Sequence, residues 1–185
     1  MSLGLLDVVH TRAVVLDGGL ATRLEERGHD LSDDLWSARL LMDRPDEVAA
    51  AHRDYFAAGA EVATTASYQL SYEGAAQRGL DHHDTDLLIM RSVTLAREAA
   101  EAFDDDRPRW VAASVGPYGA MLADGSEYTG DYGLTVAQLR AWHRPRLAAL
   151  AAAGADILAL ETIPSLAEAE ALLTELAGTG LPCWP

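Results

Sequence analysis

Residues 110–132, with the sequence WVAASVGPYGAMLADGSEYTGDY, join a short apolar segment to a polar loop rich in glycine. Residues 110–115 are apolar or small and are followed by Gly116 and Pro117, a pattern typical of a buried β-strand that ends abruptly. Beyond them tyrosines alternate with carboxylates, at Tyr118, Asp124, Glu127, Tyr128, Asp131 and Tyr132. We expect this loop to face a small-molecule substrate, because it combines amphipathic rings, charge and a permissive backbone. Local composition alone leaves a solvated surface loop as the alternative.

Strand-like segments alternate with helical patterns along the whole chain. The β-rich runs lie at residues 13–17, 61–67, 110–115 and 156–161. Helical patterns are expected at about 45–58, 84–103, 135–153 and 165–177. Helix boundaries are marked by Pro45 in a first turn, Gly59 and Gly154 after an end, and a capping box from Ser165 to Glu168. Strands separated by helices predict parallel pairing, in either an open doubly wound sheet or a (β/α)8 barrel.

Polar residues at the carboxyl ends of the predicted strands favour the barrel. These residues are Asp17, Ser67, Ser114 and Glu161. A barrel gathers such strand ends around one mouth, whereas an open sheet spreads them along a crevice. We therefore predict an α/β fold of the (β/α)8 TIM-barrel type in a single domain over residues 1–185. Only about four β/α units are present, and residues 181–185 read as the start of a fifth strand, so we expect a truncated barrel.

Composition excludes several classes of partner. The 185 residues carry a formal net charge of −15, with 29 acidic side chains against 14 basic ones, all of them arginine. This charge opposes binding to nucleic acid and to anionic membrane surfaces. The single cysteine, Cys183, cannot form a disulfide framework, and no apolar run has the length of a membrane span. The first ten residues lack the pattern of a signal peptide, so a cytoplasmic location is the expectation.

Several sequence blocks, in this order, resemble the homocysteine S-methyltransferases. Besides residues 114–132 they are LDGGLAT at 16–22, LWSA at 35–38, HRDYF at 52–56, TTASYQ at 64–69 and HRPR at 143–146. The loop at 114–132 is similar to the branch that uses S-methylmethionine as methyl donor. The resemblance implies a barrel and a zinc-dependent transfer of a methyl group from a sulfonium donor to homocysteine, which gives methionine. Whether that donor is S-methylmethionine, S-adenosylmethionine or a related sulfonium stays open.

The resemblance also implies residues that hold homocysteine. Asp17, with Gly18 and Gly19, matches the first-strand motif that binds the amino acid part of the substrate, and Glu161 matches the glutamate that binds its ammonium group. The chemistry is suitable, because a carboxylate pairs with an ammonium and glycine lets main-chain amides approach a ligand. For Asp17 a helix N-cap is the alternative from the residues alone. No residue of this chain is assigned a catalytic role.

Three aromatic residues are candidates for the donor side of the site. Trp36 lies where the family places a donor-binding aromatic ring, and an indole face suits a sulfonium cation. A core tryptophan is the alternative. Tyr68 and Tyr128 are expected to complete an aromatic wall. The histidines, including His143 in a helical pattern on the outer ring, lack the spacing of metal ligands, and no metal site is expected within this chain.

The zinc of the family has no ligands in this sequence. The resemblance places three zinc-binding cysteines in the second half of the barrel, in Gly-x-Asn-Cys and Gly-Gly-Cys-Cys segments, and neither segment occurs here. Cys183 matches neither, and one cysteine cannot form a thiolate site. We therefore interpret the chain as the N-terminal half of a homocysteine S-methyltransferase, inactive by itself. Two alternatives stay open: a zinc-free amino acid binding half-barrel, which a second chain could complete, and a remnant without function. Either way, open sheet edges predict self-association.

Overall fold

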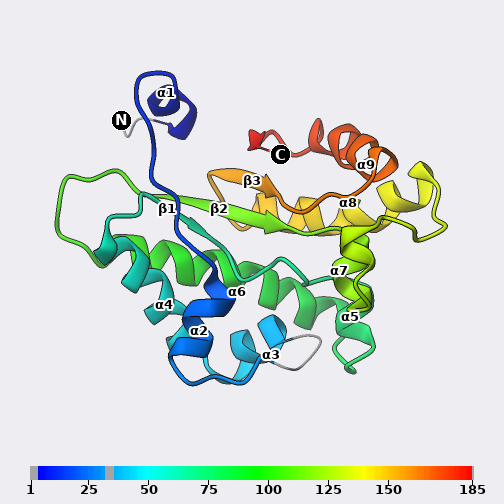
Figure 1. The fold of residues 1–185 in the computed structure, drawn as a ribbon, viewed down its shortest axis with the longest axis horizontal. Coiled ribbons are helices and arrows are strands. Elements are labelled where there is room, and N and C mark those ends of the chain that lie inside the picture. Colours follow the sequence, from blue (N-terminus) through cyan, green and yellow to red (C-terminus); the bar gives the residue numbers. More distant parts are fainter. Residues whose placement is uncertain (1–3, 32–35, 185) are drawn as a thin grey trace.

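Four parallel strands in sequential order form the sheet of this protein (Figure 1). The computed structural model describes residues 4–31 and 36–184. The strands are β1 (Val62–Thr64), β2 (Trp110–Val115), β3 (Ile157–Leu160) and β4 (Cys183–Trp184), and each pairs in parallel with the next. Parallel neighbours in sequence order, joined by helices, are the arrangement of a (β/α) barrel wall. The predicted strands at 61–67, 110–115 and 156–161 and the start of a strand at 181–185 are confirmed, and all but the second have shorter bounds than predicted.

The helices that connect the strands pack against one face of the sheet, and α1 packs against the other (Figure 1). The four predicted helices correspond to α4 (Pro45–Ala58), α6 (His82–Glu101), α8 (Val136–Ala152) and α9 (Leu166–Leu176). Shorter elements were not predicted: α1 (Leu5–Val9), α2 (Leu20–Glu26), α3 (Trp36–Asp43), α5 (Tyr72–Ala76), α7 (Tyr118–Leu122) and the 3-10 helix η1 (Ser126–Tyr128). Among the described residues, no helix has the length and apolar character needed to cross a membrane.

The predicted first strand at residues 13–17 is wrong as a full strand. The segment makes one isolated parallel bridge, between Leu16 and Val62, at the β1 edge of the sheet. Hydrogen bonds at this edge run from Asp17 N–H to Val62 O at 3.0 Å and from Glu61 N–H to Val15 O at 2.8 Å. Directly after Asp17 the chain turns through two glycines into α2, so the pairing ends before a ladder can form. The segment nevertheless occupies the position of a first strand.

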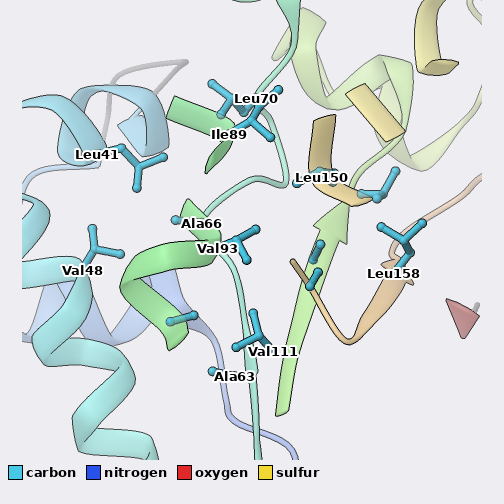
Figure 2. Close-up of a cluster of buried hydrophobic side chains, with 14 of the residues drawn as sticks. Leu41, Val48, Ala63, Ala66, Leu70, Ile89, Val93, Val111, Leu150 and Leu158 are labelled. Atoms are coloured by element: carbon cyan, nitrogen blue, oxygen red, sulfur yellow. The ribbon is translucent and has the colours of Figure 1, made fainter. Parts of the chain in front are cut away.

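The two faces of the sheet pack against different partners. On the outer face, Val111 of β2 and Leu158 of β3 join the main core with residues of α3, α4, α6 and α8, such as Val93 of α6 (Figure 2). On the inner face, Val62, Trp110 and Ile157 form a smaller cluster with Leu5 and Val8 of α1. Side chains alternate between the faces because the side-chain period of a strand is two residues. Helix α1 thus contacts the inner face where the strands begin, and it leaves their carboxyl ends free.

The predicted helix signals are present, with one correction. Pro45 occupies the first turn of α4, and Gly59 after its end has a φ of 108°, a left-handed conformation that glycine adopts at low cost. Ser165 caps α9 by accepting from the Glu168 N–H at 3.2 Å. The reciprocal half of the predicted capping box is wrong. The Glu168 side chain is fully buried and its Oε1 lies 2.9 Å from His143 Nε2, because α9 packs along α8.

Candidate functional site

A cleft of about 720 Å3 opens at the carboxyl ends of the strands. Its walls come from the segment after residue 15, from α3, from the ends of β1, β2 and β3, and from η1. All seven residues proposed to hold ligands line it: Asp17, Gly18, Gly19, Trp36, Tyr68, Tyr128 and Glu161. The structure thus brings together residues that are up to 144 positions apart in the sequence (161 − 17). Their roles in binding stay predictions.

Asp17 is held rigidly at the edge of the cleft by Thr64. One carboxylate oxygen accepts from the Thr64 N–H at 2.7 Å, and the other accepts from the Thr64 hydroxyl at 2.8 Å. Burial is the main cause that raises the pKa of Asp17 to about 6, and the negative charge of Glu161 also raises this pKa. The two hydrogen bonds from Thr64 lower it in part. Asp17 is therefore no helix N-cap. Its carboxylate is held in one orientation, and a nearby cation would stabilise the ionised form.

Glu161 follows the last residue of β3 and faces the same cleft. Its Oε2 accepts a hydrogen bond from the Ser114 hydroxyl at the end of β2, and its N–H donates to Val115 O at 3.1 Å. Burial raises the pKa of Glu161, and the bond from Ser114 lowers it in part. The next residue, Thr162, has a φ of 55°, which is uncommon for a residue with a branched Cβ. This turn ends the strand and leaves the Glu161 carboxylate at the cleft.

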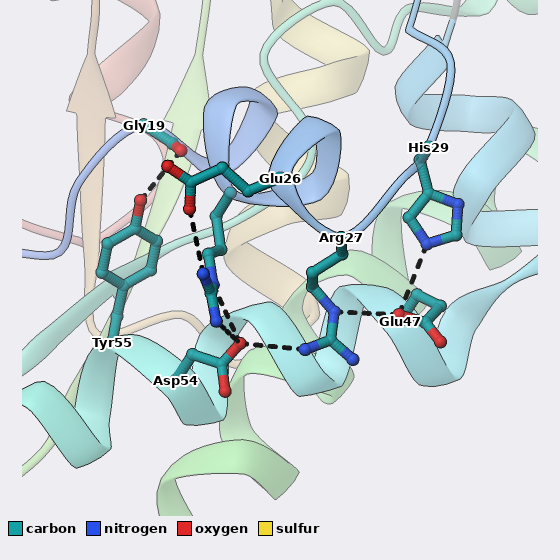
Figure 3. Close-up of polar contacts among 8 residues, drawn as sticks. Gly19, Glu26, Arg27, His29, Glu47, Asp54 and Tyr55 are labelled. Carbon is teal, nitrogen blue, oxygen red and sulfur yellow. Dashed lines mark hydrogen bonds and ion pairs between the residues drawn. The ribbon is translucent and has the colours of Figure 1, made fainter.

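The glycine pair after Asp17 is packed against Tyr55 of α4. The Tyr55 hydroxyl donates to Gly19 O at 2.9 Å, and a Cβ added to Gly18 would lie 2.9 Å from a Tyr55 ring carbon. Gly18 therefore permits a close approach that other residues would obstruct. Figure 3 shows Tyr55 reaching Gly19 beside the ion pairs that join α2 to α4. Among these, Arg23 lies 2.8 Å from Asp54.

The three predicted aromatic residues lie on different walls and differ in exposure. Trp36 and Tyr68 are partly buried, whereas Tyr128 of η1 is 76% exposed. Burial raises the pKa of the Tyr68 hydroxyl, with a hydrogen bond to Thr162 acting in the opposite direction. Trp184 of β4, which was not predicted, adds a further ring to the lining. The cleft thus has carboxylates and aromatic faces in one space.

The loop at 114–132 is only partly the substrate-facing loop that was expected. Of its tyrosines Tyr128 lines the cleft, while Tyr118 and Tyr132 pack against each other, with ring centroids 5.4 Å apart. Tyr118 also contacts the ring of Trp142 in α8. The loop carboxylates Asp124, Glu127 and Asp131 are not among the residues that line the cleft. The prediction that these tyrosines and carboxylates form the walls of the cleft is wrong in this respect, because α7 and η1 pack against each other and turn Tyr118 toward Trp142.

Several lining residues were not singled out as binding residues. Thr64 and Thr65 line the cleft at the carboxyl end of β1. The criterion that selected Ser114, a polar residue at the carboxyl end of a strand, applies to them as well. Ser37 is 1% exposed, and its hydroxyl makes no hydrogen bond within the described part of the chain. Nothing in the sequence distinguishes it except its place after Trp36.

The described residues contain no group of three or more His, Cys, Asp or Glu side chains that could hold a metal ion. Cys183 is a free thiol on β4, and it contacts the main core. These residues do not fit the zinc of the family, since a zinc site needs several such ligands. His143 lies in a helix, α8, as expected from the sequence, and it is fully buried.

Parallel β/α units with a cleft at their carboxyl ends, lined by two carboxylates, define a partial (β/α) barrel. The chain belongs to the homocysteine S-methyltransferase family, whose profile matches residues 14–185. The homocysteine S-methyltransferase of Escherichia coli (strain K12) is 53% identical to it over 163 residues, and YbgG of Bacillus subtilis (strain 168), also named homocysteine S-methyltransferase, is 52% identical over 167 residues. Each alignment covers 86% of this chain and 53% of the relative.

A solved structure agrees with the fold. The homocysteine methyltransferase MmuM from Escherichia coli, in its metallated form, superimposes with a TM-score of 0.91 at 47% identity. The match covers 96% of this chain and 64% of that one. The predicted barrel type is confirmed, and the chain spans about half the length of the curated relatives it matches.

Proposed function

We propose that this chain supplies the homocysteine-binding half of a homocysteine S-methyltransferase, which moves a methyl group from a sulfonium donor to the homocysteine thiol and forms methionine. The observation that supports this most strongly is the convergence of Asp17 and Glu161 in one cleft. Two partly buried carboxylates with raised pKa values suit an ammonium group, because a bound cation stabilises their ionised forms. Gly18 and Gly19 line the same cleft, and their main-chain N–H groups suit the carboxylate of the same ligand.

The aromatic residues suit the second substrate. A sulfonium carries a positive charge that tryptophan and tyrosine faces attract, by about 0.5–2 kcal/mol per contact. Trp36, Tyr68 and Tyr128 lie on walls of the same cleft, so a donor could bind there together with homocysteine. We also propose a cytoplasmic location, since a lone thiol such as Cys183 suits a reducing compartment.

Zinc is the part of the reaction that this chain does not provide. The family resemblance implies that zinc holds the homocysteine sulfur as a thiolate, and the described residues lack a suitable ligand set. We propose that the ligands come from a segment equivalent to the portion of the relatives that this chain does not span. The contribution of this chain is then to bind and orient the amino acid.

The experiment that tests this function is complementation. The chain is co-expressed with the uncovered portion of the Escherichia coli relative, and methionine formation from L-homocysteine and S-methylmethionine is measured with added zinc. We expect activity from the pair and none from either part alone. The same pair carrying Asp17→Asn and Glu161→Gln is the control and should lose activity. A pair that assembles and binds zinc but forms no methionine, with either sulfonium donor, would contradict the proposal.

A zinc-free binding module is the second candidate, because the cleft is built from this chain alone. Saturable binding of L-homocysteine to the isolated chain without zinc, together with an inactive complemented pair, would favour it. A chain that binds no amino acid and shows no cooperative unfolding would favour the remnant interpretation.

The affinity of the isolated chain for L-homocysteine should depend on the ionisation of Asp17. Since burial raises the pKa of Asp17 to about 6, we expect the affinity to increase as the pH rises through about 6.

The stability of the ligand-free chain should change in the opposite direction. The pKa of Asp17 in the folded state exceeds its unfolded value of about 4, so the folded state binds the proton more tightly. The free energy of unfolding therefore decreases as the pH rises from about 4 to about 6. Calorimetric titrations and urea unfolding from pH 4 to 8 measure both. Asp17→Asn should reduce both slopes, and unchanged slopes would show that another group titrates.

Self-association is expected of the isolated chain. Val15 and Leu16 are 55% and 52% exposed at one sheet edge, and β4 forms the other edge. An apolar cavity of about 400 Å3 lies between α1, residues 12–16 and Trp184. Exposed edges and apolar faces favour association with a second copy. Light scattering after size exclusion should show dimers or larger species that increase with concentration. Leu16→Glu should reduce them, whereas Leu173→Glu on α9 is the control at an exposed apolar position. A monodisperse monomer at all concentrations would contradict this.

A further inference from the structure

We infer that Arg146 is a positioning residue for the cleft: its guanidinium holds together the two chain segments that form the Tyr68 wall. Arg146 belongs to α8 and is 1% exposed. It donates to Leu70 O at 3.3 Å and to Gly116 O at 2.5 Å. Leu70 follows β1 and Gly116 follows β2, so one buried side chain bridges two neighbouring strand-end segments.

Those segments meet directly at Tyr68. The Gly116 N–H donates to Tyr68 O at 3.3 Å. A Cβ added to Gly116 would lie 2.6 Å from that oxygen and 2.7 Å from Tyr68 ring carbons. The ring therefore rests on the Gly116 backbone, and its place in the cleft depends on where Arg146 holds that backbone.

The buried side chain of His143 contacts the guanidinium and links it to the buried side chain of Glu168. His143 Nδ1 lies 3.4 Å from Arg146 Nη2, and His143 Nε2 lies 2.9 Å from Glu168 Oε1. One neutral tautomer satisfies both contacts, with Nε2–H donating to Glu168 and Nδ1 accepting from Arg146. Burial lowers the pKa of His143 to about 4, which agrees with a neutral ring at pH 7. The Trp142 ring adds a cation-π contact, with its centroid 4.9 Å from the guanidinium.

Glu168 completes the arrangement by fixing the segment after Gly116. Its Oε1 also accepts from the Tyr118 N–H at 2.6 Å. The positive charge of Arg146 and the negative charge of Glu168 are thus joined through a neutral imidazole, and each charge holds one end of residues 116–118. A buried ion pair of this kind is a costly way to gain stability, but it is well suited to specifying one geometry.

Arg146→Lys tests this inference, because lysine keeps the charge but lacks the planar fork that reaches two carbonyls. The matched control is Arg144→Lys on the same helix, where Arg144 is exposed and pairs with Glu175. The readout is the 19F spectrum of the chain labelled with 3-fluorotyrosine, in which Tyr68→Phe assigns one of the six tyrosine signals. We expect the Tyr68 signal to shift and broaden in Arg146→Lys and to stay in place in Arg144→Lys.

A second readout is the Kd for L-homocysteine, which should rise about tenfold in Arg146→Lys and stay constant in the control. If Arg146→Lys does not fold, His143→Gln serves instead, since it keeps a neutral donor toward Glu168 and should shift the same signal. A Tyr68 signal that is identical in the folded variant and the wild type would overturn the inference. The Kd readout rests on the proposed function, whereas the ligand-free spectrum does not. Failure of the wild type to bind homocysteine would therefore count against the proposed function alone.

Discussion

Glu161→Gln is expected to weaken the binding of L-homocysteine to this chain by at least about thirtyfold, which corresponds to about 2 kcal/mol. The amide has the same shape and can still accept from the Ser114 hydroxyl, so the local fold should persist. It lacks the charge that attracts the ligand ammonium, and the loss of an ion pair in a partly buried site is costly. Isothermal titration at pH 7.5 measures the two Kd values.

The controls for Glu161→Gln separate charge from structure. Glu170→Gln, at an exposed position on α9, removes the same charge away from the cleft and should leave the Kd unchanged. Ser114→Ala removes the hydrogen bond to Glu161 and should weaken binding by less than Glu161→Gln does. Equal Kd values for Glu161→Gln and the wild type would mean that Glu161 does not bind the ammonium, and Asp17 would then have to do so alone.

Glu168→Leu is expected to lower the free energy of unfolding by about 3–5 kcal/mol. Both Glu168 and His143 are fully buried, and Arg146 is 1% exposed, so removing the carboxylate leaves a buried guanidinium without its counter-charge. The Tyr118 N–H also loses its acceptor. Burial already lowers the pKa of Arg146 to about 10, which indicates an unfavourable environment for its charge. Urea unfolding followed by circular dichroism measures the change.

A double variant identifies the source of that loss. Arg146→Met together with Glu168→Leu removes both charges, and its stability should exceed that of Glu168→Leu alone, since an apolar pair avoids desolvation of a lone ion. Glu170→Leu, on the same helix and exposed, should change stability by less than about 0.5 kcal/mol. If the double variant were as unstable as the sum of the two single variants, the charges would not be coupled and the interpretation would be wrong.

The regular elements were predictable where local signals agree with burial. Residues 110–115 form β2 over the predicted bounds, because an apolar run ended by Gly116 and Pro117 has few alternatives. Helix α4 has its predicted bounds for a similar reason, with a proline at its start and Gly59 after its end. Residues 13–17 carry the same β-rich pattern but make one bridge. The pairing with β1 ends there because Gly18 and Gly19 turn the chain into α2.

The candidate site was predictable to the extent that it lies at strand ends. Asp17 and Glu161 follow strand-like segments, so a barrel fold places both at one mouth before any contact is known. The inward turn of Glu168 was not predictable, because Ser165 and Glu168 match the capping-box pattern equally well whether the glutamate faces its own helix or the neighbouring one. The packing of α9 on α8 decides between these, and it depends on residues distant in sequence.

The sequence by itself determined the alternation of strands and helices, the barrel type, the family and the two carboxylates of the cleft. These follow from hydrophobic periodicity, from the residues that begin and end helices and strands, and from sequence motifs, all of which are local properties of the chain. Only the tertiary structure decided that Tyr128 lines the cleft while Tyr132 packs against Tyr118 and Tyr118 contacts Trp142 of α8, and that His143, Arg146 and Glu168 form one buried group. The physical reason is that burial and hydrogen-bond pairing are properties of contacts between segments. The same residues would be a solvated loop and an outer helix face if α8 and α9 packed differently.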